Sequence, residues 1–179
     1  NLTIASPMDE KELRRLMYTA SLPDKGCFVI RYPRGRGIYT EWKCPLETIE
    51  VGTGRKINDG EDVAVLTLGP IGNDVQDVIA TMDKKPAHYD MRFLKPLDEN
   101  LLKEVAEKYK HIITIEDGVR NGGMGTAVME WLNDNGYTNI SVKRMGIPDK
   151  FIEHGSIDEL RAIIALDNDT IKKTICSYM

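Results

Sequence analysis

The residues best suited to bind a charged ligand are the three arginines of the segment 31–37, which reads RYPRGRG. This segment directly follows Cys27–Ile30, a short apolar run that predicts a buried strand. Ligands of open parallel sheets gather outside the carboxyl ends of the strands. Guanidinium groups offer paired donors that match a phosphate or a carboxylate, and Pro33 restricts the turn that carries them. The pattern favours an anion site on this turn, with a solvated basic turn as the alternative.

A second candidate lies between residues 111 and 132. Residues 111–116 form a β-branched run typical of a strand buried on both faces, and it ends at Asp117-Gly118. The chain then reaches Gly122-Gly123-Met124-Gly125, where a helical pattern of apolar residues begins. Free N–H groups at the start of a helix attract anions, yet the spacing is neither G-x-G-x-x-G nor that of a P-loop. We therefore interpret these glycines as a close-packing feature, with a phosphate cradle as the less favoured interpretation.

The ionisable residues form no catalytic set that spacing alone can identify. Glu116 and Asp117 are the best acid candidates, but capping of the glycine turn that follows them is the favoured interpretation. No histidine has a partner at the spacing of metal ligands, so structural or surface roles are expected for His88, His111 and His154. The cysteines form no C-x-x-C pair, which favours reduced thiols in a cytoplasmic protein for Cys27, Cys44 and Cys176.

The elements before residue 47 predict a β-α-β unit. Leu2–Ala5 and Cys27–Ile30 are strand-like, and between them Ser6 and Pro7 suit the N-cap and first position of a helix. The buried stripe of that helix is predicted to hold Leu13, Leu16, Met17 and Ala20. Two strands alone would expose sheet edges, and a chain that opens inside a strand is expected to be a piece of a longer protein.

From residue 48 onward, strands and helices alternate. An edge strand is predicted within residues 49–57, and further strands at 63–68, 87–92, 111–116 and 140–145. Helix starts are predicted near Ile71, Asp98, Met124, Ser156 and either Asp167 or Asp169. This order predicts an α/β fold: a three-layer α/β/α domain with a mostly parallel sheet and right-handed crossovers, preceded by the β-α-β unit.

Composition excludes several classes of partner. The 179 residues carry a net charge of −4, and the basic residues are scattered, so a nucleic-acid-binding face is not expected. No apolar run approaches the ~20 residues that cross a bilayer, so no membrane partner is expected either. The hydrophobic share of 41% and the charged share of 29% suit an ordinary globular chain.

Several motifs resemble one enzyme family. Ala5-Ser-Pro, Leu16-Met-Tyr-Thr and Arg31-Tyr-Pro-Arg-Gly35 are similar to the tail of the pyrimidine-binding domain of the 1-deoxy-D-xylulose-5-phosphate synthases. Three later motifs resemble that family's transketolase-type C-terminal domain: DMRFLKPLD at 90–98, TIED at 114–117 with GGMG at 122–125, and GIPD at 146–149. The match runs in order from about Leu2 to the end of the chain. It implies that residues 1–46 are the tail of the pyrimidine-binding domain and a linker, and that 47–179 are the transketolase C-terminal domain.

The resemblance also implies a reaction. The family joins pyruvate to glyceraldehyde 3-phosphate with loss of CO2, using thiamine diphosphate and usually Mg2+, and its product feeds isoprenoid, thiamine and pyridoxal synthesis. Arg34 matches the arginine that binds the phosphate of the aldehyde, and Arg31 is its neighbour by analogy. No residue matches a catalytic, cofactor-binding or metal-binding position, so the chain alone is expected to be inactive. Family members pair as dimers, and a homodimer is expected here.

Two other identities fit the same residues less well. The chain could correspond to the C-terminal part of a transketolase or of a 2-oxo-acid dehydrogenase β subunit, which share the glycine turn, but the Arg-Tyr-Pro-Arg-Gly turn argues against both. A stand-alone interaction module with no enzymatic parent is the alternative from a different functional class.

Overall fold

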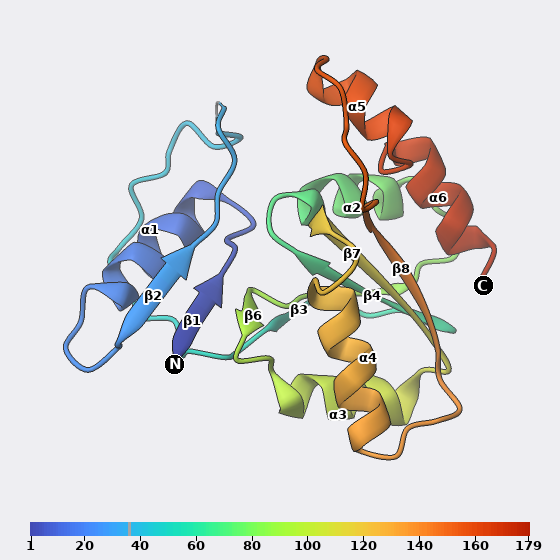
Figure 1. Cartoon of the computed structure of the whole chain (residues 1–179), viewed down its shortest axis with the longest axis horizontal. Coiled ribbons are helices and arrows are strands. Elements are labelled where there is room, and N and C mark those ends of the chain that lie inside the picture. Colours follow the sequence, from blue (N-terminus) through green and yellow to red (C-terminus); the bar gives the residue numbers. More distant parts are fainter. Residues whose placement is uncertain (36) are drawn as a thin grey trace.

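The computed structural model describes residues 1–35 and 37–179, and it contains two sheets (Figure 1). The smaller sheet has the order β2-β1-β6 and consists of β1 (Leu2–Ala5), β2 (Cys27–Ile30) and β6 (Phe93–Lys95). Strands β1 and β2 are parallel, and helix α1 (Glu10–Ala20) connects them. Strand β6 pairs antiparallel with β1, so a later segment of the chain covers one of the two edges that the isolated β-α-β unit was expected to expose.

The larger sheet has the order β3-β5-β4-β7-β8. Its strands are β3 (Arg55–Asn58), β4 (Val63–Leu68), β5 (Ala87–Asp90), β7 (His111–Val119) and β8 (Ser141–Ile147). Neighbouring strands run parallel except for β3, which pairs antiparallel with β5. The predicted mostly parallel sheet is therefore confirmed, with its antiparallel strand at one edge.

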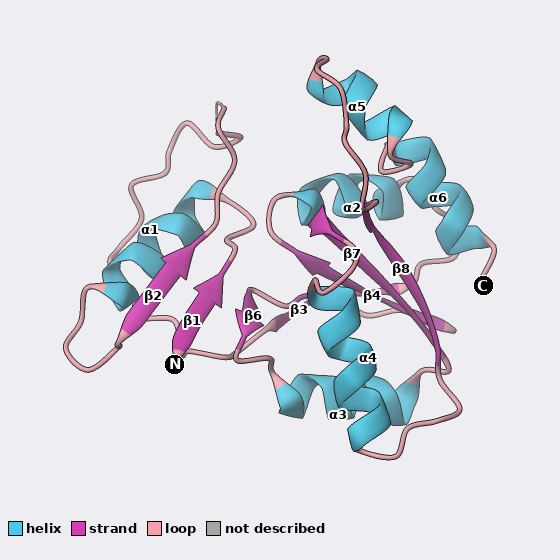
Figure 2. Ribbon diagram, viewed as in Figure 1, coloured by secondary structure: helices cyan, strands magenta, loops and turns pink. Residues whose placement is uncertain are grey.

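Helices cover both faces of the larger sheet (Figure 2). Helices α3 (Glu99–Lys108) and α4 (Met124–Asp134) lie on one face, and α2 (Ile71–Ala80) and α6 (Asn168–Cys176) lie on the other. The short helix α5 (Ile157–Ile163) precedes α6. This arrangement confirms the predicted three-layer α/β/α architecture.

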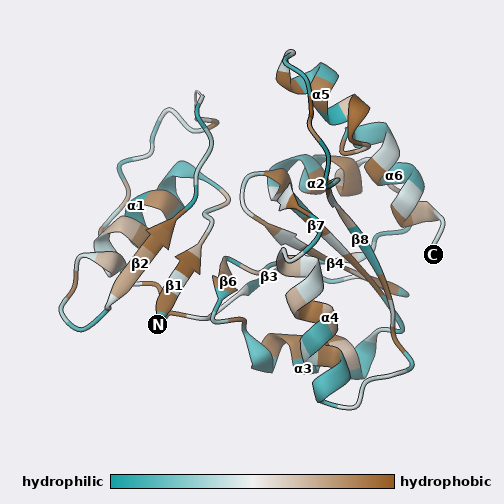
Figure 3. Ribbon diagram, in the orientation of Figure 1, coloured by the Kyte–Doolittle hydropathy of each residue, from teal (hydrophilic) through white to brown (hydrophobic). Residues whose placement is uncertain are grey.

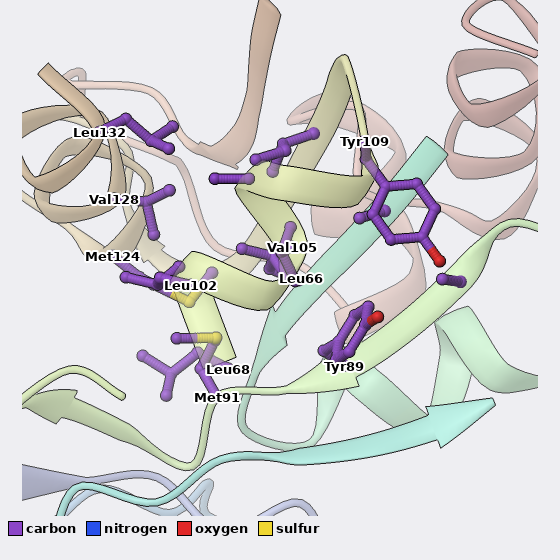
Figure 4. Close-up of a cluster of buried hydrophobic side chains, with 14 residues drawn as sticks. Leu66, Leu68, Tyr89, Met91, Leu102, Val105, Tyr109, Met124, Val128 and Leu132 are labelled. Atoms are coloured by element: carbon purple, nitrogen blue, oxygen red, sulfur yellow. The ribbon is translucent and has the colours of Figure 1, made fainter. Parts of the chain in front are cut away.

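The core explains why β4 reads as a continuous apolar run. Every residue of β4 is buried, because its side chains alternate between two hydrophobic clusters, one on each face of the sheet. On the α3/α4 side, Leu66 and Tyr89 pack with Leu102, Val105 and Val128 (Figure 4). Figure 3 shows that the hydrophobic residues also follow β1 and β2, where a third cluster under α1 holds the smaller sheet together.

Three of the predicted helix starts are confirmed by their caps. The Asp98 carboxylate accepts a hydrogen bond from the Leu101 N–H at 2.9 Å. Ser156 begins α5 with the predicted capping box. Asp167, rather than Asp169, is the N-cap of α6, and its carboxylate accepts from the Thr170 N–H at 3.0 Å.

The predicted start of α1 was wrong. The N-cap is Asp9, whose carboxylate accepts from the Glu12 N–H at 2.8 Å. Ser6 lies three residues before this cap, and its N–H donates to the Arg92 carbonyl at 2.8 Å. The predicted stripe was also partly wrong: Met17 is 59% exposed, and the buried positions of α1 are Glu12, Leu16 and Thr19.

Several strand boundaries also differ from the predictions. Strand β7 does not end at Asp117-Gly118 but continues to Val119. The single strand expected at residues 87–92 is two strands, because β5 ends at Asp90 and Arg92 takes a left-handed conformation with φ of 55°. The chain then crosses to the smaller sheet as β6. The predicted edge strand is limited to β3, since residues 49–54 are not in a strand.

Candidate functional site

The two predicted polar turns lie beside each other, although more than eighty residues separate them in the sequence. The Arg31 guanidinium donates from Nη2 to the Asp117 carbonyl at 3.1 Å. It also lies close to Gly118, where an added Cβ would come within 3.4 Å of the same Nη2. Arg31 follows β2 in the smaller sheet, and Asp117 lies in the last part of β7 in the larger sheet. The carboxyl ends of parallel strands from both sheets therefore meet at this point.

A cavity of about 350 Å³ opens between the two sheets at this junction. The smaller sheet contributes Ser6 and residues 31–33, and the larger sheet contributes Leu68 and Asp117. A second cavity of about 300 Å³ lies on the other side of the same turn, where Gly35 faces Asn73. Tyr32 and Pro33 line both cavities, so the arginine turn forms the wall between them.

Both ends of the arginine turn are fixed by hydrogen bonds. At its start, the Arg31 N–H donates to the Ala5 carbonyl at 2.8 Å, and the Ser6 hydroxyl donates to the Arg31 carbonyl at 3.2 Å. After it, the Glu10 carboxylate accepts from the N–H groups of Ile38 and Tyr39 at 2.8 and 3.1 Å. Hydrogen bonds therefore fix the chain on both sides of the turn.

Arg34 lies at the exposed tip of this turn. Among residues 1–35 and 37–179, its guanidinium takes part in no hydrogen bond or ion pair, and Arg34 does not line either of the two cavities described. Arg36, the third arginine of the predicted anion site, lies outside the described residues. The structure thus brings Arg31 into a cavity wall and leaves the Arg34 donors available to a ligand.

The glycine turn has the opposite character, because its donors are already used. Glu116 is 2% exposed, and its carboxylate accepts from the N–H groups of Met124 and Gly125, both at 2.9 Å. An added Cβ at Gly123 would lie 2.4 Å from the Glu116 carboxylate, so glycine is required for this close approach. The favoured interpretation of Glu116 as a cap is confirmed, and a phosphate cradle at this helix start is wrong.

A buried group of charges, which the sequence analysis missed, joins the two sheets. We call Glu12, Arg55, Asp90 and Arg92 the inter-sheet cluster. Glu12 accepts from Arg92 Nε at 2.6 Å and pairs with Arg55 Nη2 at 3.3 Å, while Asp90 pairs with Arg55 Nη2 at 3.1 Å. Glu12 is 1% exposed and Asp90 is fully buried. The available signal was the position of Glu12 four residues before Leu16, on the buried face of α1.

Burial perturbs two titratable groups in this region in opposite senses. Burial, aided by the Glu12 charge, raises the pKa of Asp90 to about 7, although Arg55 and Arg92 oppose the shift. Burial, together with the Arg55 charge, lowers the pKa of His88 to about 4. The Nε2 atom of His88 lies 2.9 Å from the Thr67 hydroxyl, which agrees with the structural role expected for this histidine.

The described residues show no arrangement that could hold a metal ion. Within residues 1–35 and 37–179, no group of three or more His, Cys, Asp or Glu side chains converges on a common point. In the same part of the chain, Cys27, Cys44 and Cys176 are free thiols. None of the helices described above is long and apolar enough to cross a membrane.

The fold corresponds to a known domain class. The family model "Transketolase, C-terminal domain" matches residues 52–171, and the chain belongs to this family. A solved split-gene transketolase, described as an inactive β4 tetramer, superposes with a TM-score of 0.84 at 26% identity, covering 99% of this chain and 57% of that one.

More similar relatives share one particular name. The 1-deoxy-D-xylulose-5-phosphate synthase of Bacteroides thetaiotaomicron is 59% identical over 98% of this chain, and that of Bacteroides fragilis is 58% identical over the same share. The chain spans only 28% of the length of each of these relatives. The resemblance found in the sequence is therefore confirmed over almost the whole chain, residues before the matched domain included.

Proposed function

We propose that this chain is the C-terminal part of a 1-deoxy-D-xylulose-5-phosphate synthase. Such an enzyme condenses pyruvate with glyceraldehyde 3-phosphate, releases CO2, and supplies precursors for isoprenoids, thiamine and pyridoxal. The identity of 59% over 98% of the chain supports this assignment. In the proposed division, residues 1–46 are the end of a pyrimidine-binding domain with its linker, and residues 47–179 are the transketolase C-terminal domain.

Within that enzyme, we assign Arg34 to the phosphate of glyceraldehyde 3-phosphate and Arg31 to the support of the same site. The observation that carries this assignment is the contrast between anchored ends and an exposed tip in one turn. Of the two arginines of the turn that the structure describes, Arg31 donates to the Asp117 carbonyl and Arg34 keeps its fork of donors free. A phosphate can accept two parallel hydrogen bonds from such a fork.

The described residues do not fit the cofactors of this reaction. They hold no three-member group of metal-ligating side chains, and Glu116 occupies the helix start that could otherwise bind a diphosphate. We therefore assign the binding of thiamine diphosphate and Mg2+ to other parts of the longer enzyme, and expect the chain alone to be inactive. Titration of the chain with thiamine diphosphate and Mg2+ should give no heat of binding, and micromolar affinity would contradict this assignment.

We also propose that the chain self-associates as a homodimer in the cytoplasm. In the described part of the chain, β2 pairs only with β1, so its outer edge is open to another strand. Val29 on this strand is 41% exposed. Strand β1, also expected to lack a sheet, is instead the central strand, so the open edge of β2 alone supports the proposal. Sedimentation at high protein concentration should show a dimer, and a strictly monomeric profile would contradict it.

The competing enzyme identities differ in their substrates. A transketolase would transfer a two-carbon unit from a ketose phosphate, whereas the proposed synthase uses pyruvate. The deciding experiment measures CO2 release by the full-length protein from pyruvate, with and without glyceraldehyde 3-phosphate, beside a parallel assay with a ketose phosphate donor. We expect pyruvate-dependent CO2 release that the aldehyde accelerates. Activity with the ketose alone would favour the transketolase, and inactivity with both would favour an interaction module.

A further inference from the structure

The inter-sheet cluster is more than a pair of surface ion pairs. Both of its carboxylates are buried, and each one contacts both arginine residues: Glu12 through the two guanidinium groups, and Asp90 through the Arg55 guanidinium and the Arg92 N–H at 3.1 Å. A buried carboxylate without its partner is strongly destabilised, so these groups fix one another's positions. Glu12 lies on α1, Arg55 and Asp90 lie on strands of the larger sheet, and Arg92 lies between β5 and β6, so the cluster joins the two sheets.

Arg92 is the residue of this cluster that connects to the arginine turn. It is held with φ of 55°, a left-handed conformation that is unfavourable for a residue with a Cβ. In this conformation its Nε donates to Glu12, its N–H donates to Asp90, and its carbonyl accepts from the Ser6 N–H at 2.8 Å. The conformation thus lets one residue contact both carboxylates and the segment after β1 at once.

Ser6 connects Arg92 to the arginine turn. Its hydroxyl donates to the Arg31 carbonyl at 3.2 Å, and it approaches Gly69 so closely that an added Cβ there would lie 2.4 Å from the hydroxyl oxygen. The neighbouring Met8 N–H donates to Glu12 at 3.1 Å. The segment 6–8 is therefore held on both sides by the cluster, and it in turn holds the first residue of the arginine turn.

We propose that Arg92 is a positioning residue for the substrate-binding turn: through Ser6, it sets the place of residues 31–34 relative to the larger sheet. The proposal rests on the assignment of the aldehyde phosphate to Arg34. A misplacement of about 1 Å in a group that binds the substrate can cost up to a hundredfold in rate. Weakening the cluster should therefore act on the phosphate-bearing aldehyde and spare pyruvate.

The test uses Arg92→Lys in the full-length enzyme, with Glu12→Gln as a second variant in case the first does not fold. The matched control is Arg15→Lys. Arg15 lies on α1, as Glu12 does, but it pairs with Glu47 and not with a residue of the cluster. We expect the KM for glyceraldehyde 3-phosphate to rise roughly tenfold in the cluster variants, with the KM for pyruvate within twofold of the wild type. In an Arg34→Ala background, Arg92→Lys should add little, because both changes act on one contact.

A second measurement is independent of activity. Amide hydrogen exchange at Ser6 and Arg31 in this chain should accelerate in Arg92→Lys by about tenfold or more, with Ala64 in the larger sheet unchanged. Unchanged exchange at Ser6 and Arg31 together with an unchanged KM for the aldehyde would overturn the positioning role. If Arg34→Ala leaves the aldehyde KM unaltered, the phosphate assignment itself fails, and accelerated exchange would then show only that the cluster holds the turn.

Discussion

The arginine turn and the glycine turn occupy equivalent places and have opposite properties. Each follows the carboxyl end of a parallel strand, and the Arg31–Asp117 hydrogen bond places them side by side. In the glycine turn, a buried carboxylate of the chain already accepts from the helix N–H groups. In the arginine turn, the backbone is anchored at both ends and the Arg34 side chain is exposed. The difference lies in the use of the donors: within the part of the chain that the structure describes, those of the glycine turn are occupied, and those of Arg34 are not.

The largest expected effect comes from removing the Glu116 carboxylate, which accepts hydrogen bonds in the glycine turn. Glu116→Ala removes two charge-assisted hydrogen bonds and leaves two buried N–H groups without an acceptor, so unfolding free energy should fall by about 4 kcal/mol. Urea denaturation of the chain measures this loss. Glu130→Ala, an exposed position on α4, is the control and should change stability by less than about 0.5 kcal/mol. A loss below about 1 kcal/mol in Glu116→Ala would show that the turn does not depend on its internal anion.

The next effect is the pH dependence of the unfolding free energy, to which His88 and Asp90 contribute in opposite senses. The lowered pKa of His88 means that the unfolded state binds its proton first, so this residue removes stability as pH falls from 6.5 to 4. The raised pKa of Asp90 means that the folded state binds its proton first, so this residue adds stability as pH falls from 7 towards its ordinary value. The two contributions offset each other in the wild type.

Single variants should separate the pH dependence of the unfolding free energy that is due to His88 from that due to Asp90. In Asp90→Asn, unfolding free energy should decrease by about 3 kcal/mol between pH 6.5 and pH 4, and in His88→Gln it should increase over the same interval. Chemical denaturation at a series of pH values provides the measurement. Parallel pH profiles for the two variants would mean that the buried groups do not titrate as their surroundings indicate.

A smaller effect is expected at the tip of the arginine turn, and it should appear in catalysis alone. Arg34→Ala in the full-length enzyme should lower kcat/KM for glyceraldehyde 3-phosphate by roughly ten- to a hundredfold, because it removes a charge-assisted pair with the phosphate. Arg34→Lys should recover part of the loss, since an ammonium keeps the charge but not the planar fork. The KM for pyruvate and the melting temperature should stay at wild-type values. Harm to pyruvate use alone would mean that the turn is a hinge between domains.

The smallest effect compares one glycine from each turn. Gly122 has φ of 75° and open space around it, so Gly122→Ala should cost about 1 kcal/mol through backbone strain alone. Gly35 also has open space but lies outside the left-handed region, so Gly35→Ala should change stability by less than about 0.5 kcal/mol. Thermal unfolding of the two variants decides the comparison. Equal costs would remove the conformational distinction between the turns.

Sequence patterns predicted the larger unit well because its signals are local. The apolar run of β4 and the caps Asp98 and Ser156 each act within a few residues, and they fixed the layers correctly. The failures at Ser6 and Arg92 involve segments that no local pattern relates, and a hydrogen bond joins these two residues. Asp9 caps α1 in place of Ser6, and β5 ends at Asp90 before the chain enters β6 of the other sheet.

The candidate site was predictable to a similar degree. Position after a strand identified both turns, and the motif in the first turn singled out Arg34. The sequence also favoured Glu116 as the cap of the glycine turn, but it could not show that the Arg31 guanidinium donates to the Asp117 carbonyl, since more than eighty residues separate this pair. The inter-sheet cluster was missed because its four residues come from three separate segments.

The most direct test determines whether the arginine turn or the glycine turn binds an anion. Isotope-labelled chain is titrated with inorganic phosphate at constant ionic strength, and amide chemical shifts are followed by NMR, with Arg34→Ala as the matched control. We expect saturable shifts at Tyr32, Arg34 and Gly35, their loss in the variant, and no change at Met124 or Gly125, whose N–H groups donate to Glu116. Shifts at Met124 and Gly125 without any at the arginine turn would contradict this expectation.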